Sequence, residues 1–339
     1  MPRWFLDLRS SSLGSIDKVA AGDGSMGFIR RTGEFVLTNN HNNQEPELMC
    51  DELTHQDARR FLEDKGMTRR EFGQGSATVV LGMMLPAVAG ATDVVENEVL
   101  IETPDGMADA YFVHPVKGAH AAVIVWPDVM GIRTSFRMMG KRLAESGYST
   151  LVVNPYYRTA RGPVIADGES YGMPEVRERL KPHRGSLSAE TAVIDGRAFV
   201  TYLDQQASVD TTKKMGTTGY CMTGSYVMRL AAAMPERIGA GGSFHGGRLA
   251  SDSADSPHKL ASKMRAGFLI AIAANDDQRD PEAKIKLREA FDEANVNAEI
   301  EVYADTLHGW CPPDSPVYNE PQAEKAWNRL LALFERELA

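Results

Sequence analysis

A cysteine flanked by glycines, between an apolar run and a helical run, is the feature that most constrains this chain. Residues 215–220 approach Cys221 as an apolar strand, and residues 225–234 follow it with a helical pattern. Gly219 and Gly224 lack a Cβ, so the backbone has room for a sharp strand-to-helix turn that lifts the Cys221 side chain above a sheet. The positive end of a helix favours thiolate over thiol. The pattern predicts a nucleophilic cysteine, although an isolated buried cysteine is more often a small core residue.

A carboxylate and a histidine follow the cysteine along the chain, each directly after a predicted strand. The apolar run 268–274 reaches Asp276, and the alternating run 298–303 precedes the loop that carries His308. Nucleophile, acid and histidine in this order, each at a strand end, match the layout of the α/β-hydrolase fold. We therefore predict a Cys221, Asp276, His308 triad.

Plainer interpretations of the two partners stay open. Asp276 could be a turn residue or a helix cap, and Asp277 or Asp280 could take the acid role instead. His308 could be an ordinary loop histidine, one of eight in the chain. Its place after the last predicted strand favours it over His245, which follows another strand and is expected to line a pocket or bond to backbone.

The remaining pattern predicts one α/β domain with a mostly parallel, doubly wound sheet flanked by helices. An antiparallel hairpin, 98–103 with 108–114, opens it. Further strands are expected at 121–126, 150–154, 215–220, 237–244, 268–274 and 298–303. Helices are expected at 135–146, 189–206, 225–234, 281–294 and 320–338. The stretch 158–188 exceeds an ordinary loop, which suggests a lid or substrate wall.

From about Asn97 to the C-terminus the sequence resembles the dienelactone hydrolase family. The segments that carry the resemblance are Gly219-Tyr220-Cys221, Ala273-Ala274-Asn275-Asp276, Leu307-His308-Gly309, Val123 to Gly131, and Asn154 to Arg158. The resemblance implies a carboxylic ester hydrolase of the carboxymethylenebutenolidase type. Its substrate would be a small ester or an (enol-)lactone such as a dienelactone, cleaved by the Cys-His-Asp triad through a thioester and without a cofactor.

The resemblance also implies roles for residues around the triad. Asp128 stands where the family has a glutamate that pairs with the resting thiol, and the backbone N–H groups of Val129 and Met222 would form the oxyanion hole. The candidates for substrate contact are Tyr156, Arg158, Arg177, Arg179, His245 and Trp310.

Three positions depart from the family pattern. Asp128 is one methylene shorter than the glutamate, and Thr223 replaces a glycine usual in the turn. Pro312 stands where the family has an arginine that holds a substrate carboxylate. The resemblance therefore indicates the reaction class better than it indicates a particular lactone.

The N-terminal part of the chain resembles a twin-arginine export signal. The paired arginines Arg69 and Arg70 precede a modest apolar stretch, 75–86, and small residues up to Ala91 offer cleavage sites. We expect a signal segment at 49–91, recognised by the twin-arginine export machinery, and a periplasmic hydrolase domain at 92–339. A cytoplasmic protein, or an uncleaved anchoring helix, is the alternative.

The segment upstream of the paired arginines has two parts. A polar helical pattern opens at Met49, and residues 1–48 have no clear pattern, so they are either a disordered extension or a start-site artefact. The apolar stretch of the signal is too short to favour a spanning helix, so we expect no stable membrane span in the mature form.

The composition of the chain argues against two classes of binding partner, nucleic acids and metal ions. The formal net charge is −9 with no basic cluster, which argues against nucleic acid. His-Glu-x-x-His and Cys-x-x-Cys patterns are absent from the sequence, so no metal site is predicted.

The cysteines suggest a second hypothesis. Removal of the signal would discard Cys50 and leave Cys221 and Cys311, and export favours oxidation of neighbouring thiols. A Cys221–Cys311 disulfide would make a redox-responsive thiol protein on a hydrolase scaffold. A third hypothesis is a non-catalytic binding module, in which Cys221→Ala would change no activity.

Overall fold

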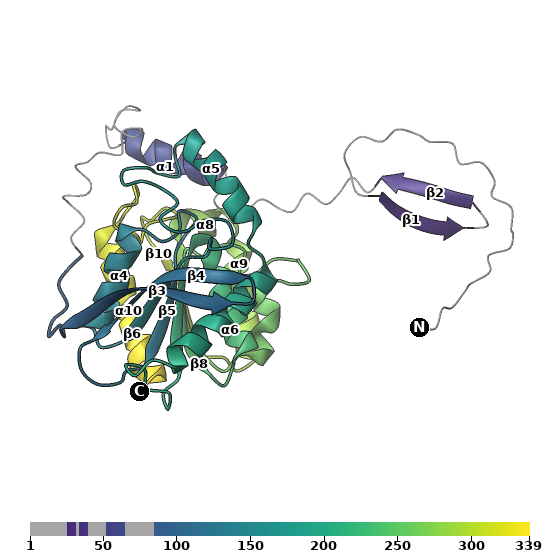
Figure 1. Ribbon diagram of the computed structural model, residues 1–339. Coiled ribbons are helices and arrows are strands. Elements are labelled where there is room, and N and C mark those ends of the chain that lie inside the picture. The colour runs from purple at the N-terminus through teal and green to yellow at the C-terminus, as the bar shows by residue number, and fades with distance from the viewer. Residues whose placement is uncertain (1–25, 32–33, 40–51, 65–84) are drawn as a thin grey trace, which may run out of the picture. The chain divides into compact units, whose positions relative to one another are not determined.

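The computed structural model of the chain describes residues 26–31, 34–39, 52–64 and 85–339 (Figure 1). The chain divides into two units, residues 1–47 and 48–339, which we describe separately. In the first unit, strand β1 (Met26–Arg31) pairs antiparallel with β2 (Glu34–Asn39). The paired arginines of the predicted signal lie outside the described residues.

The second unit is built on one eight-stranded sheet in the order β10-β9-β8-β7-β5-β6-β4-β3. Its strands are β3 (Val94–Thr103), β4 (Gly106–Pro115), β5 (Ala122–Trp126), β6 (Ser149–Val153), β7 (Met215–Tyr220), β8 (Ile238–Phe244), β9 (Gly267–Ala273) and β10 (Ala298–Tyr303). β3 and β4 form the predicted antiparallel hairpin, and β4 also runs antiparallel to β6. All other neighbours are parallel, so the predicted α/β-hydrolase fold is confirmed.

Helices cover both faces of this sheet. One face carries α6 (Ala189–Asp204), α7 (Gly224–Ala233) and α9 (Pro281–Glu293), which contribute to one hydrophobic core. The other face carries α4 (Thr134–Glu145) and α10 (Glu320–Glu337), which contribute to a second core. The central strands are buried on both faces, which is why they appear in the sequence as continuous apolar runs.

Four helical segments lie outside the predicted catalytic-domain helices. Helix α5 (Pro174–Gly185) forms within the stretch expected to be irregular, and α8 (Ala274–Arg279) follows β9 directly. Two short 3₁₀ helices, η1 (Cys221–Thr223) and η2 (Pro257–Lys263), flank α7 and β8 in the chain.

Helix α1 (Glu52–Asp64) forms where the polar helical segment is expected, and it belongs to the same unit as the sheet. None of the helices in the described ranges has the length and apolarity needed to cross a bilayer.

Candidate active site

The turn between β7 and α7 places Cys221 in a conformation that side chains rarely adopt. Its φ is +58°, in the left-handed region that is uncommon for any residue but glycine. A Cβ on Gly219 would clash with the carbonyl oxygen of Thr223, and one on Gly224 would come within 2.5 Å of Gly246 Cα. Only glycine fits at both places. Such a strained turn persists because its surroundings enforce it, and strain of this kind concentrates at functional sites.

Thr223, which replaces a family glycine, helps to enforce that turn. Its hydroxyl accepts a hydrogen bond from the Tyr220 N–H at 3.0 Å and lies 2.9 Å from the Trp126 carbonyl oxygen, to which it can donate. The hydroxyl therefore connects the turn after β7 to the end of the neighbouring strand β5. The departure from glycine adds a bond that holds the turn closed.

The acid and the histidine meet at the adjacent strand ends. His308 Nδ1 lies 2.8 Å from Asp276 Oδ2, and both side chains are buried. The backbone N–H of His308 also donates to Asn275 Oδ1 at 2.9 Å, which fixes the histidine loop against α8. Asp277 instead binds Lys284 Nζ at 2.6 Å from both carboxylate oxygens. The structure thus places Asp276 rather than Asp277 against the histidine.

A single cavity brings the predicted nucleophile and histidine together. Cys221 and His308 both line it, and so do Asp128, Val129 and His245. The rest of the lining comes from the 170–172 loop, from the loops that carry Met130, Gly309 and 315–317, and from Thr54 and Ala58 of α1. Residues from five loops and one N-terminal helix therefore enclose one space around the cysteine.

Asp128 is held by an arginine that sequence patterns do not reveal. Arg133 binds it through two bonds, Nη1 to Oδ1 at 2.7 Å and Nη2 to Oδ2 at 3.0 Å, and also binds Asp314. Burial lowers the pKa of the Arg133 guanidinium, but the two carboxylates outweigh this effect and raise it overall. Asp128 is therefore a charged anchor for the loop that contains Val129, since a bidentate pair fixes both position and orientation.

Tyr156 braces the two residues predicted to form the oxyanion hole. It is fully buried, its hydroxyl donates to the Val129 carbonyl at 2.7 Å, and it contacts Met222 Sδ at 3.8 Å. Burial raises its pKa well above the usual value, so the hydroxyl remains a hydrogen-bond donor. Tyr156 supports the site from behind instead of lining the cavity.

His245 stands beside the histidine of the predicted triad. Its ring centroid is 5.0 Å from that of His308, and burial, with the charge of His308, holds its pKa well below the ordinary value. Neither ring nitrogen has a hydrogen-bond partner among the described residues. A neutral, polar ring therefore faces the cavity next to His308.

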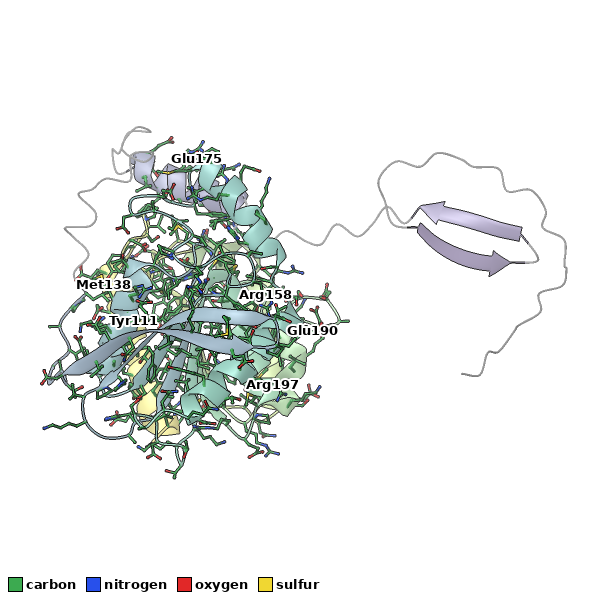
Figure 2. All side chains as sticks on the ribbon, in the orientation of Figure 1. Tyr111, Met138, Arg158, Glu175, Glu190 and Arg197 are labelled. Carbon is green, nitrogen blue, oxygen red and sulfur yellow. The ribbon has the colours of Figure 1, made fainter. Side chains whose placement is uncertain are left out.

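The other predicted substrate contacts have structural partners elsewhere. Arg158, labelled in Figure 2, binds Asp105 and Asp195, and Trp310 is stacked on Tyr303 within the core. Arg177 donates to the carbonyls of residues 171 and 172, and Arg179 pairs with Glu169. The residues described as lining the cavity include none of these four. Arg177 still affects the site, because residues 171 and 172 belong to the cavity wall.

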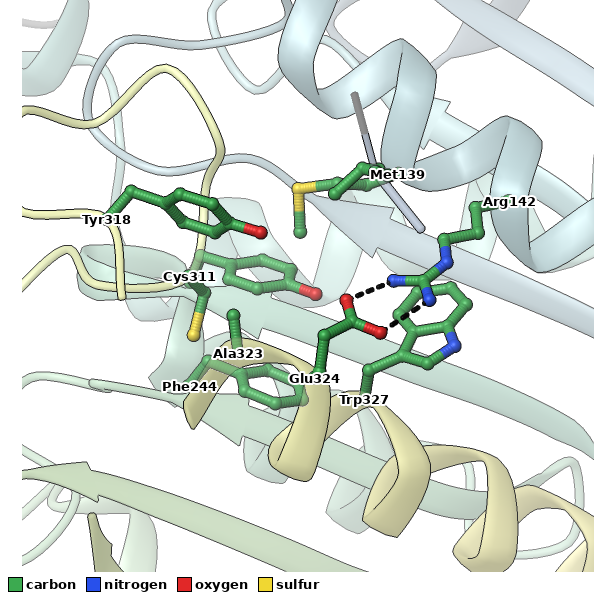
Figure 3. A pocket seen from close by; sticks show the side chains of 10 residues that line it. Met139, Arg142, Phe244, Cys311, Tyr318, Ala323, Glu324 and Trp327 are labelled. Carbon is green, nitrogen blue, oxygen red and sulfur yellow. Dashed lines mark hydrogen bonds and ion pairs between the residues drawn. The ribbon is translucent and has the colours of Figure 1, made fainter. Parts of the chain in front are cut away.

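The cysteines correct one expectation. Cys221 is disulfide-bonded, whereas Cys311 is free and buried, so the Cys221–Cys311 disulfide of the second hypothesis does not form. Cys311 lines a separate, mostly apolar pocket, in which it lies near Phe244 and Ala323 (Figure 3). Burial raises its pKa well above that of an ordinary thiol. Cys311 is not among the residues described as lining the cavity that contains Cys221 and His308.

Comparison with known proteins identifies the family. The sequence profile described as "Dienelactone hydrolase family" matches residues 108–338. The chain belongs to the dienelactone hydrolase family. It is thus a hydrolase of the carboxymethylenebutenolidase type, as the sequence predicts.

Individual relatives agree with this membership. A Synechocystis protein named as a carboxymethylenebutenolidase is 27% identical over 233 residues, covering 67% of this chain and 91% of the relative. A Bradyrhizobium protein named as a 2-oxo-3-(5-oxofuran-2-ylidene)propanoate lactonase is 24% identical, with 66% of this chain and 86% of the relative covered.

Solved structures share the fold. A Klebsiella pneumoniae structure named as a dienelactone hydrolase superposes with a TM-score of 0.62 at 22% identity, covering 72% of this chain and all of the other. An Anabaena variabilis dienelactone hydrolase gives a TM-score of 0.52 at 16% identity, covering 73% of this chain and 99% of the other. The matched family region, 108–338, begins after α1.

Proposed function

We propose that the protein hydrolyses small activated esters or enol lactones by acyl transfer through Cys221. The observation that carries the proposal is the shared cavity. The strained turn presents Cys221 to it, and the Asp276–His308 pair borders it. Nucleophile, base and orienting acid are the minimum set for covalent acyl transfer.

The proposed reaction has two halves. His308, with Nδ1–H directed at Asp276, accepts the Cys221 thiol proton at Nε2, and the thiolate attacks the carbonyl carbon of the substrate. The oxyanion intermediate, bound by the N–H groups of Val129 and Met222, then expels the alkoxide or enolate, which takes the proton from His308. Each oxyanion donor contributes about 3 kcal/mol in comparable sites. Water deprotonated by His308 then cleaves the thioester, which releases the acid and restores the thiol.

The disulfide at Cys221 adds a requirement. A thiolate must be present for attack, so the oxidised form is inactive until an external dithiol reduces the bond. Two thiols form on the protein while the dithiol becomes a disulfide. The proposed hydrolase is therefore active only in its reduced form. The redox response of the second hypothesis is kept, but its Cys221–Cys311 disulfide is not.

The cavity indicates which substrates to test. Its described lining contains no arginine or lysine, and Pro312 occupies the family position for a carboxylate-binding arginine. We therefore propose uncharged lactones and esters as better substrates than acids of the same shape. Because a thiolate is readily expelled from the tetrahedral intermediate, the leaving group must be good, and amides are poor substrates. The lactone in the name of the Bradyrhizobium relative carries a carboxylate, so it is included among the test substrates as a charged compound.

A paired-substrate assay tests this function. Reduced protein is given enol lactones and aryl esters, each as a free acid and as its methyl ester, and hydrolysis is followed spectrophotometrically. We expect turnover with the uncharged member favoured, and loss of turnover in Cys221→Ala. Equal activity of that variant would support a non-catalytic binding module with contaminating hydrolysis.

We also propose export to the periplasm through the twin-arginine machinery. The support is the sequence pattern around Arg69 and Arg70. Cell fractionation of the wild type and an Arg69→Lys, Arg70→Lys double variant tests it. Periplasmic protein in the wild type, with retention of the variant in the cytoplasm, is expected; the same distribution for both would disprove export by this route.

A further inference from the structure

We propose that helix α1 is a removable wall of the active-site cavity, which restricts the full chain to small substrates. The proposal rests on the hydrolase function proposed above. Thr54 and Ala58 of α1 line the same cavity as Cys221 and His308. These two residues are four positions apart, so they lie on one face of the helix. Figure 1 draws α1 and α5 at the same end of the catalytic unit.

Helix α1 is held by the buried side chain of Leu62 and by polar contacts, most of which involve Asp57. Asp57, between Thr54 and Ala58 in sequence, accepts hydrogen bonds from Asn275 Nδ2 at 3.0 Å and Arg279 Nη2 at 2.5 Å. Arg279 also donates to Thr54 Oγ1 at 3.0 Å. The side chains of Asp57 and Arg279 are 29% and 26% exposed, and ion pairs this open to water are weak. These polar bonds therefore contribute little to the stability with which α1 is held.

The same two partners hold the catalytic pair. Asn275 uses its amide nitrogen for Asp57 and its amide oxygen for the backbone N–H of His308. Arg279 Nη1 lies 4.0 Å from Asp276 Oδ1 as well as bonding to α1. The wall and the Asp276–His308 pair are thus fixed by a shared set of side chains. Movement of α1 would therefore change the size of the cavity and, through Asn275, the position of His308.

Helix α1 lies outside the matched family region. It ends at residue 64, whereas the family match begins at residue 108, so the family domain does not itself supply this wall. Helix α1 lies within the proposed signal segment, 49–91, so cleavage near Ala89 or Ala91, together with reduction of the disulfide at Cys221, would separate the helix from the hydrolase domain. The full chain would then have a narrow cavity and the processed chain an open one.

Three substitutions in the full-length chain, reduced with dithiothreitol, test whether α1 is a wall of the cavity; one of them is a control. Ala58→Trp places a large ring on the cavity face, and Arg60→Trp places the same ring on an exposed position of the same helix as the control. Asp57→Ala removes the bonds from α1 to Asn275 and to Arg279 Nη2. Thermal unfolding is measured for each variant, so that loss of the fold is recognised.

The readout is the size selectivity of Cys221. Alkylation by iodoacetamide and by a bulky N-aryl maleimide is followed by mass spectrometry at the peptide containing Cys221, and the ratio of the two rates is compared with the wild type. We expect Ala58→Trp to lower the maleimide rate by about tenfold or more, in the range that pocket shape usually supplies. Asp57→Ala should raise the maleimide rate relative to iodoacetamide by about fivefold, and Arg60→Trp should leave the ratio within about twofold.

Alkylation does not depend on ester hydrolysis, so the two proposals fail separately. If folded Ala58→Trp and Asp57→Ala both keep the wild-type ratio, α1 is not a wall of the site, whatever the enzyme hydrolyses. If the ratios change as expected but no ester or lactone is turned over, the wall stands and the proposed function is wrong.

Discussion

Two cysteines with almost the same burial differ in what the protein does with them. Cys221 and Cys311 are 2% and 7% exposed. Cys221 lies at a strained turn and borders a cavity shared with His308, whereas Cys311 sits among apolar and aromatic side chains. Exposure alone would rank the two alike. The reactivity proposed for Cys221 therefore rests on the backbone turn and on the neighbouring His308, not on access to solvent.

Replacing each cysteine by alanine is the strongest test of this difference. We expect Cys221→Ala to lower kcat/KM for an aryl ester by at least about a thousandfold, because the covalent route is lost. Cys311→Ala removes only a buried sulfur and should stay within about threefold of the wild type. It should lower the melting temperature instead, because it leaves a small cavity. The opposite ranking of the two variants would reassign the nucleophile.

The carboxylates near His308 allow a similar paired test. Asp276→Asn keeps the shape of the side chain but no longer favours the histidine tautomer with its proton at Nδ1, so kcat should fall by roughly a thousandfold. Asp277→Asn breaks only the bond to Lys284 and should change kcat by less than about twofold. Steady-state rates on one aryl ester measure both. A larger loss in the Asp277 variant would show that the wrong acid has been assigned.

The two cysteines also differ in oxidation state, because Cys221 is disulfide-bonded and Cys311 is free. The sequence has three cysteines, and Cys311 is free, so the residue to test as the partner of Cys221 is Cys50, which lies outside the described residues. Full-length protein prepared without reductant should gain about a hundredfold in activity with dithiothreitol, since the disulfide withholds the thiolate. Cys50→Ser should be active without the dithiol. Cys311→Ser should retain the dependence, and a chromogenic thiol titration reports the free thiols in each protein.

Sequence patterns predicted the parts of the site that depend on local chain geometry. The strand ends that carry Asp276 and His308 follow apolar runs, and Gly219 and Gly224 mark the turn at Cys221. Helix α5 was missed because it is largely polar and contains Pro182. Helix α8 was missed because it has six residues and begins where β9 ends.

Contacts between distant parts of the chain could not be predicted in this way. Arg133 and Asp314 are 181 positions apart, and Asp57 and Asn275 are 218 apart, with no periodic signal to connect them. Polar pairs of this kind depend on how surface loops and helices meet after the sheet has formed. The hydrophobic pattern fixes the sheet but carries no information about these partners.

Two adjacent tyrosines give the smallest and most specific prediction. The hydroxyls of Tyr156 and Tyr157 are both hydrogen-bonded within the fold, but Tyr156 donates to Val129 beside the cavity and Tyr157 donates to Asp195. Replacing either by phenylalanine should cost about 1 kcal/mol of stability, so both variants should unfold at similarly reduced temperatures. Only Tyr156→Phe should also lower kcat, by about tenfold with KM nearly unchanged, because the Val129 N–H would no longer be held where the oxyanion forms. If Tyr157→Phe lowers kcat equally, the loss comes from general destabilisation, and Tyr156 has no positioning role.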